Sequence, residues 1–383
     1  MNDSSWEISE RHVHRVLFTR DVFAPSNDCL AHALAPESAS RNRVQVFVDA
    51  GLCRARPELV KAIASWFSEY PQFELVAAPV VVPGGEIAKN DSAALDAIWQ
   101  AMADARLCRH SRIVAIGGGA VLDAVGFAAA TAHRGIPLVR LPTTSLSQAD
   151  GGVGVKNAVN RFGRKNWLGC FTVPLAVVND LAFLDTLPPR ERRAGLIEAA
   201  KVALIRDARF FDEIARFAEA IAAFEREPYE RTIRESARQH VEHIATAGDP
   251  FERGSARPLD FGHWAAHKLE QMSGFELSHA EAVAVGMALD LVYARFAGLL
   301  AAPLADRILG VTKRLGFNLY TPLLERQRSD GQLEVLGGLE EFREHMGGEL
   351  AIPMIRAPGE RVLVNAIDSV LLAAAVKELR THE

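Results

Sequence analysis

The chain has 383 residues, which is long enough for two domains with a large apolar core. Its formal net charge of −5 argues against a nucleic-acid partner, because such binding depends on a basic surface. No apolar run reaches the about 20 residues of a membrane span, and the acidic N-terminus lacks the apolar region of a signal peptide. The four cysteines are scattered without a CxxC pair, so we expect a reduced, cytoplasmic protein. Because no membrane span is predicted, we expect no membrane partner.

The first half of the chain alternates predicted strands and helices. Apolar residues at helical spacing, such as Val60, Ile63 and Trp66, mark the helices, and short runs rich in β-branched residues mark the strands. Strands are predicted over residues 13–19, 43–49, 73–82, 112–116 and 136–141, and helices over 57–70, 92–105 and 121–132. This alternation predicts an α/β domain with a mainly parallel sheet.

The second half is predicted to be mostly helical. Amphipathic segments follow one another over residues 190–206, 208–224, 229–247, 263–273, 280–297 and 305–315. A short hairpin is expected around residues 352–364, before a last helix over 369–379. The change of pattern places a domain boundary near residue 187, which gives domains 1–187 and 188–383.

Two strand ends in the first half have a composition suited to a nucleotide. The strand predicted over 112–116 runs directly into Gly117-Gly118-Gly119 and a helix, where backbone N–H groups can face a phosphate. The strict G-x-G-x-x-G form is missing, so a glycine-rich turn without a ligand remains the alternative. Asp49 ends an earlier strand and could accept hydrogen bonds from ribose hydroxyl groups. A role in a turn or as a helix cap explains an aspartate at this position equally well.

The segment from Leu141 to Asn160 reads as a loop rich in small and hydroxyl residues. It carries Asp150 and Lys156, and Arg164-Lys165-Asn166 follows it. Cationic and amide donors in such a loop indicate recognition of an anion. A solvated basic turn remains the alternative.

Three histidines indicate a metal site. His263 and His267 lie one helical turn apart, and His279 stands before the next predicted helix. With a carboxylate, such a set can hold a divalent metal and leave one position open. Glu198, three residues before Lys201 on a predicted helix, would complete a His, His, Glu set. The alternatives are histidines with ordinary hydrogen bonds and a surface Glu198–Lys201 ion pair.

In order and spacing, these motifs resemble the sugar phosphate cyclases of the dehydroquinate synthase superfamily, and in particular the sedoheptulose 7-phosphate cyclases of the valiolone and epi-valiolone synthase type. The resemblance spans roughly residues 40–300. It implies an α/β N-terminal NAD-binding domain and a mainly α-helical C-terminal metal-binding domain, with the active site in the cleft between them. The motifs that carry it are Gly-Gly-Gly with Asp123, Leu-Pro-Thr143-Thr144, Asp150 with Lys156, Glu198 with Lys201, and His263, His267 and His279.

The resemblance also implies cofactors and roles. Zn²⁺, or alternatively Co²⁺, would be held by Glu198, His263 and His279. NAD would contact Asp49, Glu86, Lys89, Gly117, Gly118, Gly119, Asp123, Thr143, Thr144 and Lys165. The residues implied in catalysis are Asp150, Lys156, Lys201 and His267, and those implied in substrate binding are Asn166, Asp260, Arg134, Arg343 and His345. Arg134 resembles an arginine that the family lends to the neighbouring subunit, which implies a homodimer.

The chain departs from the dehydroquinate synthase pattern at several positions, most of which are cationic in that pattern. In the family pattern Arg-x-Leu-Leu-Asn-x-Gly-His, the arginine is Ala256 here and the asparagine is Asp260, while Arg257 lies one residue off on a different face. The family lysine seven residues before Asp249 is Glu242. The C-terminal Asp-Lys-Lys signature is replaced by the segment 340–348, which contains Arg-Glu-His-Met-Gly-Gly.

These departures concern the substrate. Dehydroquinate synthase acts on a sugar that carries both a phosphate and a carboxylate. A carboxylate that this chain places in the pocket would repel the carboxylate of that substrate. Two like charges about 4 Å apart repel by about 4 kcal/mol at an effective dielectric constant near 20, which corresponds to roughly a thousandfold loss in binding. Sedoheptulose 7-phosphate lacks the carboxylate, and cyclases acting on it carry an Arg-Glu-His-x-Gly-Gly segment like residues 343–348. The sequence therefore predicts a heptulose phosphate cyclase of the valiolone type.

The expected reaction oxidises a ring hydroxyl to a ketone, eliminates phosphate, returns the hydride, opens the ring and closes it again by an intramolecular aldol step. Lys156, Lys201 and His267 are expected to stabilise charge and to move protons. The alternatives are a 3-dehydroquinate synthase, an NAD-dependent metal polyol or glycerol dehydrogenase, and a non-catalytic descendant that only binds a nucleotide or a partner. The dehydrogenase would release NADH in bulk, whereas a cyclase would release phosphate.

Overall fold

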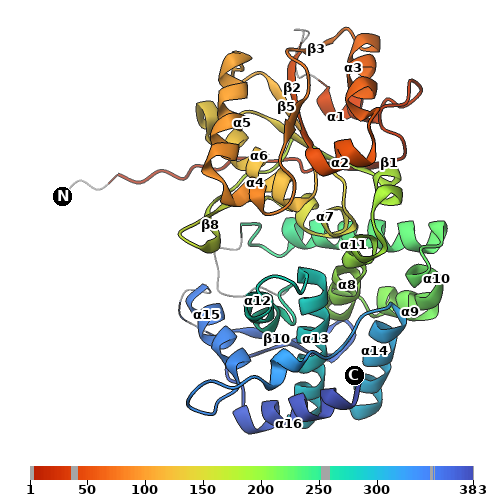
Figure 1. Ribbon diagram of the computed structural model, residues 1–383, viewed down its shortest axis with the longest axis vertical. Helices are drawn as coiled ribbons and strands as arrows, with labels where there is room; N and C mark the ends of the chain where they lie inside the picture. The colour runs from red at the N-terminus through yellow and green to blue at the C-terminus, as the bar shows by residue number, and fades with distance from the viewer. Residues whose placement is uncertain (1–3, 36–41, 252–258, 346–347, 349, 383) are drawn as a thin grey trace. The chain divides into compact units, whose positions relative to one another are not determined.

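The computed structural model describes the chain except for residues 1–3, 36–41, 252–258, 346–347, 349 and 383. It divides into two compact units, shown in Figure 1: Met1–Thr143 with Val155–Ala182, and Thr144–Gly154 with Phe183–Glu383. The sequence predicted two continuous domains with one boundary near residue 187. In the structure, residues 144–154 instead join the second unit, because Ser145 Oγ donates to Glu191 O at 2.6 Å and accepts from Gly195 N–H at 2.8 Å.

The first unit is built on a seven-stranded parallel sheet. Its strands are β1 (Val16–Thr19), β2 (Asn42–Asp49), β3 (Phe73–Leu75), β4 (Val80–Val82), β5 (Arg112–Gly117), β6 (Leu138–Pro142) and β9 (Ala176–Asp180). They lie in the order β1-β9-β6-β5-β2-β3, and β4 also pairs with β2. The predicted strand 73–82 is thus two short strands, which pair with opposite ends of β2. The central strand β5 is buried along its whole length, as its apolar run predicts.

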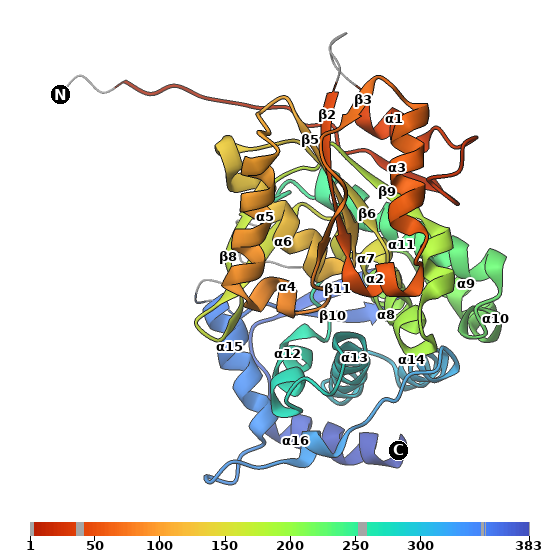
Figure 2. The same ribbon diagram turned by 45° about the horizontal axis from the view of Figure 1, so that its top comes forward.

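Helices cover both faces of this sheet. In Figure 2, α1 (Cys29–Leu34) and α3 (Leu59–Glu69) lie on one side of the strands, and α5 (Ser92–Asp104) and α6 (Gly119–Thr131) on the other. Short helices α2 (Ala50–Ala55) and α4 (Ile87–Asn90) follow the ends of β2 and β4. An antiparallel hairpin of β7 (Lys156–Arg161) and β8 (Arg164–Phe171) completes the unit. The prediction of a loop over 141–160 was wrong, since α7 (Ser145–Ala149) and β7 form there.

The second unit is mainly helical, so the predicted fold class is confirmed for both halves. Its longer helices are α8 (Pro189–Arg206), α9 (Ala208–Arg216), α11 (Arg226–Thr246), α12 (His263–Met272), α13 (His279–Phe296), α14 (Ala302–Arg314), α15 (Gly337–His345) and α16 (Ser369–Leu379), with a short α10 (Ala218–Ala222). The hairpin consists of β10 (Ile352–Ala357) and β11 (Glu360–Val364). The predicted helix 208–224 is divided into α9 and α10, and α15 was not predicted. Within the described residues, no helix is both long and apolar enough to cross a membrane.

Two glycines bring α12 and α13 into close backbone contact. Gly262 precedes α12 with a φ of 78°, a conformation that favours glycine. A Cβ atom on Gly286, in the middle of α13, would overlap the Gly262 carbonyl oxygen. Glycine at both positions therefore sets how closely the start of α12 approaches α13.

Replacing Gly286 with alanine should lower the free energy of unfolding by about 1–3 kcal/mol, because the added methyl group forces the two helices apart. Gly310 in α14 is a matched control, since a Cβ there meets no atom within 4 Å. Gly310→Ala should raise the unfolding free energy by about 0.5–1 kcal/mol through the entropy of the unfolded chain. Urea unfolding followed by circular dichroism measures both changes, and equal effects would contradict the close contact.

Candidate functional site

One face of α12 carries the polar side chains of the candidate site. His263, His267 and Glu270 are spaced i, i+4 and i+7, so they lie on one side of the helix. His279 is the first residue of α13, whose start is fixed by a capping box between Ser278 and Glu281. The ring centroids of His263 and His279 lie 5.3 Å apart, and that of His267 lies 5.5 Å and 5.9 Å from them. Three imidazoles from two helices thus converge.

Glu198 on α8 meets two of these imidazoles. Glu198, His263 and His279 each offer one ligand atom, and these atoms lie within 4.8 Å of one another. The Glu198 side chain is 1% exposed and forms an ion pair with Lys201. Even so, neither of its carboxylate oxygens accepts a well-oriented hydrogen bond from the described residues. A buried carboxylate whose oxygens lack such donors suits a cation, so the residues fit a divalent metal. Their role as ligands stays a prediction.

The surroundings of His263 favour its metal-binding form. Its Nδ1 lies 3.2 Å from the Phe261 carbonyl oxygen, which can only accept, so Nδ1 carries the proton and Nε2 keeps its lone pair. Burial, the ammonium of Lys201 and the neighbouring imidazoles of His279 and His267 hold the pKa of His263 well below its usual value. His263 is therefore a neutral imidazole, which is the form that binds metals.

Lys201 is the buried cation of the site. It stands one turn after Glu198 on α8, and its side chain is 4% exposed. Burial alone would lower the pKa of Lys201, but the carboxylates of Glu198, Asp150 and Asp260 together raise it. The structure thus groups the predicted residues Asp150, Lys201 and Asp260 with the candidate metal ligands. The alternative of a surface Glu198–Lys201 pair was wrong, because both side chains are buried.

Sequence reasoning missed His240. This residue of α11 places Nδ1 2.5 Å from Oδ1 of Asp150, the residue that ends α7. Burial would raise the pKa of Asp150, but His240 and Lys201 hold it well below its usual value. No spacing in the sequence links His240 to Asp150, since only the packing of α11 against α7 brings them together.

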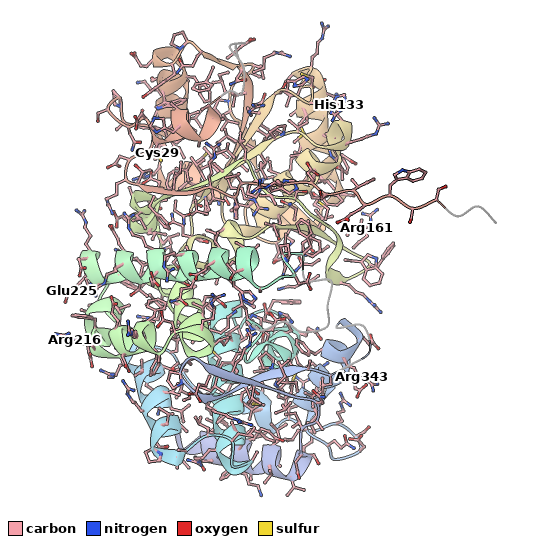
Figure 3. The ribbon with its side chains drawn as sticks, turned by 180° about the vertical axis from the view of Figure 1, so that it is seen from behind. Cys29, His133, Arg161, Arg216, Glu225 and Arg343 are labelled. Carbon is pink, nitrogen blue, oxygen red and sulfur yellow. The ribbon has the colours of Figure 1, made fainter. Side chains whose placement is uncertain are left out.

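Arg343, predicted to bind substrate, and the positions that depart from the family pattern lie in different surroundings. Glu242 of α11 pairs with Arg238 at 2.6 Å, and its side chain is 46% exposed. Arg343 of α15, labelled in Figure 3, pairs with Glu340 at 2.6 Å on the helix surface. Ala256 and Arg257 fall outside the described residues, as does the side chain of His345. The roles predicted for these positions stay predictions.

In the first unit, a buried lysine that was predicted to contact NAD bonds to two other predicted site residues. Lys89 Nζ of α4 donates to Asp123 Oδ2 of α6 at 2.6 Å and to Asn166 Oδ1 of β8 at 2.5 Å. Burial raises the pKa of Asp123, and Lys89 opposes that rise. The predicted NAD residues Lys89 and Asp123 are therefore linked directly to Asn166, which was predicted to contact substrate.

The same network extends through the β7–β8 hairpin. Asn160 Nδ2 donates to Glu86 Oε2 at 2.8 Å, and its Oδ1 accepts from the Asn166 N–H at 2.8 Å. Lys165 Nζ lies 4.0 Å from Glu86 Oε1. Asn160 is a second residue that sequence reasoning did not single out, although it joins two predicted ones.

The strand-end motif of the first unit has mainly structural contacts. Asp49 caps α2, because its Oδ1 accepts from Gly51 N–H at 2.6 Å and Leu52 N–H at 3.2 Å. A Cβ on Gly117 would lie 2.7 Å from the Val121 Cβ, whereas a Cβ on Gly119 would meet nothing within 4 Å. Gly118 is the N-cap of α6. Open space at a helix N-terminus suits a phosphate, but the nucleotide roles stay predictions.

Three further predicted residues have local structural positions. The Thr143 N–H donates to the Gly117 carbonyl oxygen at 3.0 Å. Thr144 is the N-cap of α7 and forms a capping box with Ser147. Arg134 is exposed after α6 and has a φ of 65°. Its predicted role in a homodimer stays a prediction.

A buried carboxylate anchors the start of α12. Asp290 of α13 accepts from Gly262 N–H at 3.0 Å and from Trp264 Nε1–H at 2.9 Å. Burial raises the pKa of Asp290 to about 7, against these two donors. Asp290 thereby holds the turn that carries His263.

The raised pKa of Asp290 predicts a pH dependence of stability. An unfolded aspartate has a pKa of about 3.9, so the folded state binds this proton more tightly, with a pKa of about 7. The resulting stabilisation is complete below the unfolded pKa and is lost as the pH rises through about 7. Urea unfolding of the metal-free protein should therefore show the wild-type advantage over Asp290→Asn shrinking from pH 5 to pH 8, by at most about 1.4 kcal/mol per pH unit. A constant difference would contradict the raised pKa.

Comparison with known proteins also matches the chain in two parts, which meet near residue 194. The profile of the 3-dehydroquinate synthase N-terminal family matches residues 79–194, and that of the C-terminal family matches residues 195–333. A 3-dehydroquinate synthase of Geobacter sp. (strain M21) is 38% identical over 251 residues, which are 65% of this chain and 68% of that protein. The 2-epi-valiolone synthase of Actinosynnema mirum is 34% identical over 301 residues, which are 78% of this chain and 77% of that protein.

A solved structure is similar over nearly the whole chain. It is 2-epi-5-epi-valiolone synthase from Streptomyces hygroscopicus subsp. jinggangensis 5008, with NAD⁺ and Zn²⁺ bound. The TM-score is 0.85 at 28% sequence identity, and the match covers 99% of this chain and 100% of that one.

Proposed function

This chain belongs to the 3-dehydroquinate synthase family, a family of sugar phosphate cyclases, and from that premise we propose a reaction for its site. The resemblance inferred from its motifs is thereby confirmed. The proposed reaction is the cyclisation of sedoheptulose 7-phosphate to a valiolone-type cyclitol, with elimination of phosphate and no net redox change. This makes the chain a carbon–oxygen lyase.

The proposed cofactors are NAD⁺ and Zn²⁺, with Co²⁺ as an alternative metal. Glu198, His263 and His279 would hold the metal, since they combine a buried carboxylate with two converging imidazoles. The network around Lys89 and Asp123 would face the nucleotide. When bound, NAD⁺ supplies a reversible hydride acceptor and Zn²⁺ a Lewis acid for a substrate oxygen.

The protein's own residues would manage charge and protons. Lys201, held as a buried ammonium by carboxylates, would stabilise negative charge on a substrate oxygen. Asp150, paired with His240, would accept a hydrogen bond from a substrate hydroxyl group and so orient it. His267 is exposed beside the two histidine ligands and would contact the substrate. Lys156 of β7 keeps its predicted role in stabilising charge.

The observation that carries the choice of substrate is Asp260, a third carboxylate beside Lys201. Glu198, Asp150 and Asp260 all act on this ammonium. Glu198 and Asp150 belong to the motifs shared with the family, whereas Asp260 stands where the family pattern has an uncharged asparagine. The added negative charge opposes a substrate carboxylate. A sugar phosphate without a carboxylate, such as sedoheptulose 7-phosphate, avoids this repulsion.

The test is an incubation of the enzyme loaded with NAD⁺ and Zn²⁺, with sedoheptulose 7-phosphate beside the heptulosonate phosphate that carries a carboxylate. We expect phosphate release from sedoheptulose 7-phosphate without lasting NADH absorbance. Turnover of the carboxylated sugar alone would identify a 3-dehydroquinate synthase instead, in line with the similarity to that enzyme. Accumulation of NADH without phosphate would identify a dehydrogenase.

The charge argument makes a further prediction. Asp260→Asn should raise kcat/KM for the carboxylated sugar relative to sedoheptulose 7-phosphate by at least about tenfold, because it removes one like charge from the cluster. Asp212→Asn is the matched control, since Asp212 is an exposed carboxylate of α9 paired with Arg307 at 2.6 Å. A ratio that moves equally in both variants would rule out a specific role for Asp260.

A further inference from the structure

His279 lies between two buried carboxylates that come from different helices. Its Nε2 is 3.8 Å from Glu198 Oε1 of α8, and its Nδ1 is 3.2 Å from Glu270 Oε2 of α12. The Glu198 and Glu270 side chains are 1% and 6% exposed. Each ring nitrogen therefore faces its own carboxylate, and the sequence motifs accounted for only one of the two.

This arrangement allows two overlapping sets of metal ligands. One is Glu198, His263 and His279, and the other is His267, Glu270 and His279. The two sets share only His279, so the ring nitrogen that His279 offers decides between them. Nε2 belongs with Glu198, and Nδ1 belongs with Glu270.

Three observations favour the set that contains Glu198. The Glu198 oxygens accept no well-oriented hydrogen bond from the described residues, whereas Glu270 already bonds His279 Nδ1. Glu198 and His263 are buried, whereas His267 is exposed. His263 uses Nδ1 on the Phe261 carbonyl oxygen, which leaves Nε2 for a metal. With Nδ1 held by Glu270, His279 offers Nε2 in the same way.

We propose that Glu270 is a positioning residue of the metal centre, a role that rests on the metal site of the proposed function. Its carboxylate accepts the Nδ1–H of His279, which fixes the tautomer and the ring plane and leaves Nε2 directed toward Glu198. The negative charge behind the ring also makes Nε2 more electron-donating. Glu270 thus does for His279 what the Phe261 carbonyl does for His263, and it adds a charge.

The spacing of residues along α12 explains why one helix supplies both a proposed ligand and the proposed positioning residue. Glu270 follows His263 by seven residues, which is two helical turns, so both side chains leave the same face. The anchor that Asp290 provides at Gly262 and Trp264 therefore sets the place of the ligand His263 and of the positioning residue Glu270 at once.

The test measures Zn²⁺ affinity by competition with a chelating indicator, without substrate. Glu270→Gln should weaken binding by about 10- to 100-fold, the usual loss when the carboxylate behind a histidine ligand is removed. Glu198→Gln, which removes a ligand, should weaken it further. Glu341→Gln is the matched control, because Glu341 of α15 bonds Lys268 of α12 at 2.7 Å and lies outside both ligand sets. It should bind Zn²⁺ like the wild type.

The visible spectrum of the Co²⁺-loaded protein provides a second readout. The bands of Glu270→Gln should keep the pattern of wild-type coordination, whereas those of Glu198→Gln should change. If Glu270→Gln does not fold, Glu270→Asp carries the same expectation, because the shorter side chain withdraws the carboxylate from Nδ1.

Three results would overturn the proposal or its premise. Zn²⁺ affinity of Glu270→Gln equal to that of Glu341→Gln would remove the role of Glu270. A larger loss in Glu270→Gln than in Glu198→Gln would make Glu270 a ligand. Failure of the wild type itself to bind Zn²⁺ would refute the metal centre of the proposed function, independently of Glu270.

Discussion

The second unit depends on the burial of the Glu198 carboxylate in the middle of α8. A carboxylate in such a place is costly unless cations compensate it, and burial raises the pKa of Glu198 accordingly. Lys201 compensates it in part from one turn away, and the imidazoles of His263 and His279 meet it from α12 and α13. Three helices thus place their polar side chains around this one buried carboxylate.

Small residues allow that convergence. A Cβ on Gly195 of α8 would overlap the backbone of Ser145 in α7, and a Cβ on Gly286 of α13 would overlap Gly262 before α12. Because α7 packs so closely on α8, Asp150 at the end of α7 comes within electrostatic reach of Lys201. Helix contact through glycine thus converts separate stretches of sequence into one charged cluster.

The cluster also links structure to the choice of substrate. The family pattern has an arginine, an asparagine and a lysine where this chain has Ala256, Asp260 and Glu242. The structure describes two of these positions, Asp260 and Glu242. Asp260 acts on the buried Lys201, whereas Glu242 is half exposed and paired with Arg238. Of the two, only Asp260 therefore supports the proposal of a substrate without a carboxylate.

The sequence by itself determined the α/β first half and the helical second half, and its resemblance to a family singled out the residues proposed as metal ligands. Helical and strand periodicity are local properties, and His263 and His267 are neighbours on one helix whatever lies around them. Local patterns were insufficient in two places. One strand was predicted over 73–82, but β3 and β4 form there because each pairs with a different end of β2. A loop was predicted over 141–160, but the short helix α7 forms there and packs against α8.

Only the tertiary structure decided how the second unit incorporates residues 144–154 and which groups surround each ligand. The contacts of His240 with Asp150, of Glu270 with His279 and of Asp290 with Trp264 join side chains from different helices. Their burial, charge and tautomer follow from helix packing, which has no signature in the spacing of residues along the chain.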